Sequence, residues 1–131
     1  MKSLKFIFDK KGPYFNTIID TQSVLNAISL MKADNLSYLI VLNKAGKFLG
    51  LITEKDYLRN VKLVGKNSET TLVSEIINTD LPIVDLNDGI DECINILEAH
   101  KVNYLIVFNN RTFYGVITIH DLLRAVSNKN Y

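Results

Sequence analysis

Cysteine is almost absent from this sequence, and charge of neither sign dominates it. Cys93 stands alone, so no internal disulfide can form, and the chain suits a reducing compartment. The 15 basic and 14 acidic residues give a formal net charge of +1, without the basic excess typical of nucleic-acid-binding proteins. No apolar run approaches the length that spans a bilayer, and the N-terminal apolar stretch is too short for a secretory signal. We therefore expect a cytoplasmic protein that binds neither nucleic acid nor membrane.

Patterns typical of catalytic and metal sites are also missing from the sequence. Cys93, His100 and His120 are too few and too scattered to form a zinc site. No glycine-rich phosphate loop, nucleophile elbow or catalytic Cys–His pattern occurs. We therefore expect a protein that is not an enzyme, holds no metal and requires no cofactor.

What the sequence does contain is a duplication. Residues 37–61, SYLIVLNKAGKFLGLITEKDYLRNV, match residues 103–126, NYLIVFNNRTFYGVITIHDLLRAV, with one residue fewer in the middle. The apolar spacing predicts a strand, a helix, a hairpin of two strands and a closing helix in each copy. We predict an α+β fold in which two such β-α-β-β-α units pack with pseudo-two-fold symmetry. The first repeat spans 14–64, the linker 65–79 and the second repeat 80–127 of a single 1–131 module.

Local signals place the ends of several elements. Gln22–Ser23 and Asn87–Asp88 are candidate caps for the first helix of each repeat, and the closing helices should begin near Thr53 and Thr118. The segment 71–77, TLVSEII, predicts a short helix in the linker. Cys93 corresponds to Ala27 of the first repeat, so we expect a small, buried position.

The strongest motif ends each repeat. It is Gly-Leu-Ile-Thr-Glu-Lys-Asp at 50–56 and Gly-Val-Ile-Thr-Ile-His-Asp at 115–121. These two copies, with the linker, resemble the tandem CBS-domain family, named for cystathionine β-synthase. The sequence departs from the common family pattern at Ile40 and Ile106, where proline is frequent, at Tyr38 and Tyr104, where histidine is common, and at His120, where glycine is common.

The resemblance implies a stand-alone CBS-pair regulatory protein. Such proteins bind adenine nucleotides (AMP, ADP or ATP) in the cleft between the two repeats, and we expect AMP foremost, in an energy-sensing role. The family also implies homodimers and a signal to a partner protein or an attached domain. Apolar residues beyond the needs of one core support a homodimer: Leu25, Leu30, Leu122 and Leu123.

The Thr-x-x-Asp spacing has two compatible interpretations. It is a helix cap, in which threonine and aspartate bond each other's backbone amides. It also suits a ribose phosphate, because a helix start attracts phosphate and a carboxylate accepts bonds from ribose hydroxyls. The candidate nucleotide-binding residues at the helix starts are Thr53, Lys55, Asp56, Arg59, Thr118, His120, Asp121 and Arg124. The candidate apolar lining of the purine slots is Ile18, Tyr38, Ile40, Ile83, Tyr104 and Ile106.

Each candidate also has a purely structural interpretation. Arg59 and Arg124 can pair locally with Asp56 and Asp121, His120 can be a solvated helix residue, and the apolar residues can be sheet core. For the whole chain, two other hypotheses stay open. It can be the N-terminal regulatory part of a larger enzyme such as a nucleotidyltransferase, or a dimerisation module without a ligand.

Overall fold

The structure is a computed structural model that describes residues 2–127, so the ends of the expected module lie outside the described residues. The chain divides into two compact units. One contains Phe15–Thr79, and the other contains Met1–Tyr14 together with Asp80–Tyr131. The N-terminal segment therefore belongs with the second repeat, and the expected linker belongs with the first.

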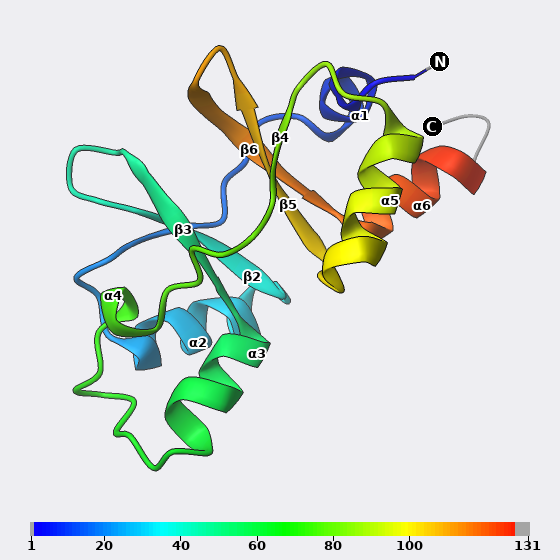
Figure 1. The fold of residues 1–131 in the computed structure, drawn as a ribbon. Coiled ribbons are helices and arrows are strands. Elements are labelled where there is room, and N and C mark those ends of the chain that lie inside the picture. Colours follow the sequence, from blue (N-terminus) through cyan, green and yellow to red (C-terminus); the bar gives the residue numbers. More distant parts are fainter. Residues whose placement is uncertain (1, 128–131) are drawn as a thin grey trace. The chain divides into compact units, whose positions relative to one another are not determined.

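The first-repeat unit has a three-stranded sheet in the order β1-β2-β3, of which Figure 1 labels β2 and β3. β1 pairs with β2 in parallel, and β2 pairs with β3 in antiparallel, as a hairpin requires. α3 continues into η1, a π-helical stretch, and the predicted linker helix is present as α4. The elements are β1 (Thr17–Ile19), α2 (Val24–Ala33), β2 (Tyr38–Leu42), β3 (Phe48–Thr53), α3 (Glu54–Tyr57), η1 (Leu58–Lys62) and α4 (Val73–Ile76).

The second-repeat unit repeats this topology, with the order β4-β5-β6 and the same parallel and antiparallel pairings. The β-α-β-β-α order predicted for both repeats is therefore confirmed. The unit also carries a helix that the sequence analysis did not predict, α1, beside α6. The elements are α1 (Leu4–Lys11), β4 (Ile83–Asp85), α5 (Ile90–His100), β5 (Tyr104–Asn109), β6 (Thr112–Thr118) and α6 (Ile119–Ser127).

The two predicted caps of α2 and α5 have different outcomes. Ser23 caps α2, because its hydroxyl accepts a bond of 3.1 Å from the Asn26 amide. The prediction for Asn87–Asp88 is wrong, since α5 starts after Gly89 without a side-chain cap. The Asp88 carboxylate instead accepts a bond of 2.9 Å from the Asp85 amide, within the turn that follows β4.

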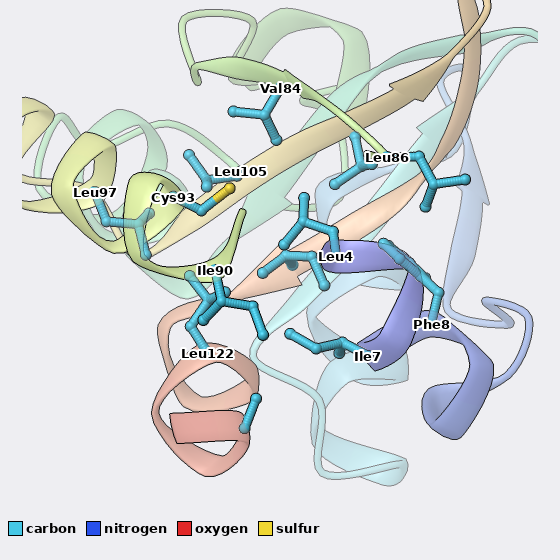
Figure 2. Close-up of a cluster of buried hydrophobic side chains, with 13 residues drawn as sticks. Leu4, Ile7, Phe8, Val84, Leu86, Ile90, Cys93, Leu97, Leu105 and Leu122 are labelled. Atoms are coloured by element: carbon cyan, nitrogen blue, oxygen red, sulfur yellow. The ribbon is translucent and has the colours of Figure 1, made fainter. Parts of the chain in front are cut away.

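The core of the second-repeat unit joins α1, α5, α6 and the sheet (Figure 2). Leu4, Ile7 and Phe8 of α1 are buried in it, which anchors the N-terminal helix. Cys93 is fully buried, as is Ala27 in the other unit, so the small buried position is confirmed. Burial, and then the nearby carboxylates of residues 88 and 92, raise the pKa of the Cys93 thiol to about 12.

Leu122 is also fully buried in this core. Its assignment to a dimer surface is therefore wrong, because the helical period turns Leu122 inward and leaves the adjacent Leu123 half exposed.

The glycine that begins each motif is in close contact with another part of its unit, which leaves no room for a side chain. A Cβ atom on Gly50 would stand 2.6 Å from the carbonyl oxygen of Asn78, and one on Gly115 would stand 2.6 Å from the ring of Phe8. In the first unit the nearest covering atom belongs to the backbone of Asn78, which exchanges two backbone bonds of 3.1 and 2.8 Å with Leu51, and the Ile77 side chain lies beside it. In the second unit the cover is a side chain.

This difference predicts unequal tolerance of alanine. We expect Gly50→Ala to destabilise the protein by about 1–3 kcal/mol, the usual cost of overpacking, because the Asn78 backbone must move. Gly115→Ala should cost less, since the Phe8 ring can shift. Urea denaturation of both variants measures the two losses, and an equal or larger loss for Gly115→Ala would contradict the interpretation.

Candidate functional site

The first-repeat motif forms a reciprocal cap at the junction of β3 and α3. The Thr53 hydroxyl oxygen accepts a bond of 3.1 Å from the Asp56 amide. Asp56 Oδ2 accepts bonds from the Thr53 amide at 3.0 Å and from the Thr53 hydroxyl at 2.8 Å. All hydrogen bonds of the Asp56 carboxylate with described residues use Oδ2, so Oδ1 has no partner among them. The cap therefore fixes a half-buried carboxylate at the start of a helix.

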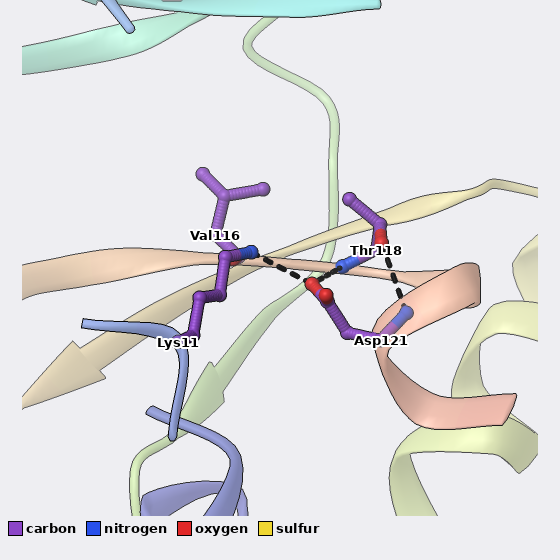
Figure 3. A network of polar contacts seen from close by, with 4 residues as sticks. All are labelled: Lys11, Val116, Thr118 and Asp121. Atoms are coloured by element: carbon purple, nitrogen blue, oxygen red, sulfur yellow. Dashed lines mark hydrogen bonds and ion pairs between the residues drawn. The ribbon is translucent and has the colours of Figure 1, made fainter. Parts of the chain in front are cut away.

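The second-repeat motif has the same cap between β6 and α6. Asp121 Oδ2 accepts a bond of 3.0 Å from the Thr118 amide, and the Thr118 hydroxyl oxygen accepts one of 3.1 Å from the Asp121 amide. Figure 3 shows a second donor at this carboxylate, the ammonium of Lys11. Lys11 Nζ lies 2.7 Å from Asp121 Oδ2 and 3.0 Å from the carbonyl oxygen of Val116. Asp121 is only 8% exposed.

Strand register places four of the predicted lining residues beside these caps. Tyr38 lies opposite Thr53, and Tyr104 lies opposite Thr118. Ile40 and Ile106 follow two positions later, on the same sheet face as the tyrosines, and both are buried.

The first strand of each repeat adds one residue to this sheet face. In the second repeat it is the predicted residue, Ile83, and in the first repeat it is not the predicted Ile18. Ile83 is 63% exposed and pairs with Ile106, but the residue paired with Ile40 is Thr17. Ile18 pairs with Val41 and packs in the helix-side core. A shift of one residue sends a side chain to the opposite sheet face, so Thr17 takes the place that the sequence analysis gave to Ile18.

The charged candidates lie on the surface around the helix starts. Lys55, Arg59, His120 and Arg124 are all exposed. Within residues 2–127, Arg59 forms no ion pair, so the local pair with Asp56, one of its two interpretations, is absent. The guanidinium of Arg59 is therefore available to an anion, for which its planar shape is suited.

The first unit also has a pocket of about 620 Å³ that the sequence analysis missed. It lies between α2 and the start of α3, and its lining is mainly apolar: Ile28, Met31, Leu36, Tyr57 and Leu58, with Lys32, Asn35, Glu54 and Lys55. Neither Thr53 nor Asp56 lines it, so the pocket is separate from the cap.

Two further features bear on the class of protein. Residues 2–127 contain no group of three or more histidine, cysteine, aspartate or glutamate side chains placed to hold a metal ion. Across the same residues, none of the helices is both long and apolar enough to cross a membrane.

Comparison with known proteins identifies the two repeats. The family profile described as "CBS domain" matches residues 13–63 and 73–128, which together make up most of the chain. The chain belongs to the CBS-domain family. A protein with CBS domains from Burkholderia ambifaria has the same fold, with a TM-score of 0.88 and 27% identity over 99% of this chain and 97% of that one.

Two other CBS proteins show similar coverage. The crystal structure of the CBS domain NE2398 aligns with a TM-score of 0.85 and 31% identity, over 95% of this chain and 97% of that one. The CBS domain-containing protein YhcV of Bacillus subtilis is 24% identical over 115 residues, which cover 87% of this chain and 81% of its own. These similarities confirm the resemblance and the fold predicted from the paired motifs.

Sequence reasoning missed Lys11 because its partner lies 110 residues away. A signal for α1 itself was present. Leu4, Ile7 and Phe8 follow the spacing of one helical face. No local pattern, however, shows that the last residue of this helix meets the aspartate of the second motif.

Proposed function

We propose that this CBS-pair protein is a regulatory protein that binds adenine nucleotides, AMP foremost, through the Thr-x-x-Asp motif of each repeat. The observation that supports this most is the reciprocal cap, present in both repeats, which holds a carboxylate at a helix start. Two such caps at equivalent register positions give two similar polar sites. Each has a tyrosine and a buried isoleucine on the adjacent strand.

The chemistry of the first site can be assigned group by group. Asp56 offers Oδ1 to a ribose hydroxyl, since a carboxylate is purely an acceptor. The Thr53 hydroxyl can rotate from Asp56 to a phosphate oxygen. The start of α3, continued by η1, offers the positive end of a helix, and Arg59 one turn further on adds positive charge. Tyr38 and Ile40 offer apolar surface to the purine.

The proposed role is regulatory and not catalytic. The groups at the caps are hydrogen-bond acceptors, donors and positive charge suited to holding a nucleotide, so we propose that the nucleotide is bound and not converted. Binding changes the protein only as far as the nucleotide favours one arrangement of the chain over another. A partner protein, or an enzyme domain in the same polypeptide, would respond to that change. A cytoplasmic location remains a prediction.

Asp56→Asn tests the proposed site. The change preserves size and leaves an oxygen to accept the Thr53 amide, but it removes the charge that strengthens the ribose bond. Losing a bond to a charged group costs about 1.5–3 kcal/mol, so AMP affinity at the first repeat should fall roughly ten- to a hundredfold. Isothermal titration calorimetry of AMP into wild type and variant measures the change.

Glu54→Gln is the matched control for this experiment. It removes the same charge from the same helix turn, but Glu54 takes no part in the cap, so AMP affinity should stay near the wild-type value. Equal AMP binding by wild type and Asp56→Asn would show that the site is elsewhere. No binding of AMP, ADP or ATP by wild type would contradict the proposed function itself.

We also propose that the protein is a homodimer. Leu123 and Val126 of α6 are 50% and 58% exposed and lie on one helix face. Sedimentation velocity at tens of micromolar should show a dimer, and Leu123→Lys should shift it towards the monomer. Thr112→Lys, at an exposed hairpin position, should remain dimeric. A monomeric wild type at this concentration would contradict the proposal.

A further inference from the structure

The two caps differ in what occupies the carboxylate. In the first repeat, the second donor to Asp56 Oδ2, besides the Thr53 amide, is the Thr53 hydroxyl at 2.8 Å, which can rotate towards a ligand. In the second repeat, the second donor to Asp121 Oδ2, besides the Thr118 amide, is the Lys11 ammonium at 2.7 Å, which comes from the N-terminal helix (Figure 3).

The neighbouring strand position differs in the same way. Leu51 pairs with Ile40, and Val116 pairs with Ile106, so the two residues are equivalent. Leu51 exchanges backbone bonds with Asn78, whereas the carbonyl oxygen of Val116 accepts a bond of 3.0 Å from Lys11 Nζ. Lys11 is therefore anchored at two acceptors of the second motif, and the first motif has no such cation among the described residues.

This anchoring affects the group that would hold a ribose. Bonds between an ammonium and a carboxylate are short and about twice as strong as bonds between neutral groups. A ribose that approaches Asp121 must displace the lysine or share a carboxylate that the lysine already neutralises. The carboxylate is also less accessible, since Asp121 is buried and Asp56 is half-buried.

Resting on the proposed function, we infer that Lys11 is a specificity-determining residue that makes the two nucleotide sites unequal. In the free protein it occupies the aspartate of the second repeat. AMP therefore binds the first repeat first and binds the second repeat more weakly, because it must displace Lys11 or share Asp121 with it.

Lys11 can leave without releasing its helix. Leu4, Ile7 and Phe8 are buried in the core of the second-repeat unit, so apolar contacts hold α1 in place. Gly12, with a φ of 79°, ends the helix directly after Lys11 and accommodates a conformation that other residues rarely adopt. The lysine is thus the last residue of a docked helix, with a flexible side chain.

The test isolates the second site in an Asp56→Asn background. Calorimetric titration of AMP into Asp56→Asn and into Asp56→Asn/Lys11→Met compares that site with and without the ammonium. We expect Lys11→Met to raise AMP affinity about tenfold or more. Asp56→Asn/Lys10→Met removes the same charge from the same helix, and Lys10 lies over the Phe6 ring, 5.7 Å from its centre, so affinity should not change.

Unchanged or weaker AMP binding in the Lys11→Met protein would overturn the inference, and so would no binding in either protein. Weaker binding would show that the lysine contacts the nucleotide phosphate. AMP titration of the wild-type protein distinguishes failure of the Lys11 inference from failure of the proposed function. If wild type binds AMP but Lys11→Met has no effect, only the inference fails, whereas both fail if wild type binds no adenine nucleotide. Thermal unfolding of each variant confirms that it is folded.

Discussion

The reciprocal hydrogen bonds between threonine and aspartate at the end of each hairpin are the constraint on which the rest of the structure depends. They stop the strand, start the helix and satisfy backbone amides that would otherwise lack partners. They also hold the aspartate in one orientation. A group that serves as a helix cap is thereby held in place, and under the proposed function the same side chains serve both stability and binding.

The threonine–aspartate cap occurs in both repeats, but different residues surround it in each. Around the first cap, the backbone of Asn78 and the side chain of Ile77 cover Gly50, and the Asn78 backbone pairs with Leu51. Around the second, Phe8 covers Gly115 and Lys11 bonds the carbonyl oxygen of Val116. A segment of backbone in one unit is thus replaced by two side chains of α1 in the other. A duplicated fold can therefore carry two sites of unequal affinity without any change in its strands, helices or motif spacing.

Much of the fold could be predicted from the sequence because its signals are local. The alternation and helical spacing of apolar residues gave the element order of both repeats, and the motif spacing gave the caps at Thr53 and Thr118. The wrong predictions concern features that the local sequence pattern does not determine. Ile18 was assigned to the wrong sheet face because two adjacent isoleucines fit either register. Asn87–Asp88 failed as a cap because the carboxylate of Asp88 bonds within the preceding turn instead.

The candidate site was predictable only in part, for a related reason. A helix cap joins two residues that are three positions apart, so the spacing of threonine and aspartate in the motif is enough to predict it. Lys11 reaches Asp121 across 110 residues through the packing of α1, which depends on the whole core of the unit. The matching positions of the two aspartates in the repeated motif therefore identified them as equivalent. The packing of α1 gives Asp121 a lysine partner that Asp56 lacks among the described residues.

The most direct test of this account follows the backbone amide NMR signals of the wild-type protein during titration with AMP. The account predicts that the amides of residues 53–56 shift first, and that those of residues 118–121 and 11 shift together at higher AMP concentration. Shifts confined to other segments, or no shift at saturating AMP, would contradict the claim that these caps bind the nucleotide.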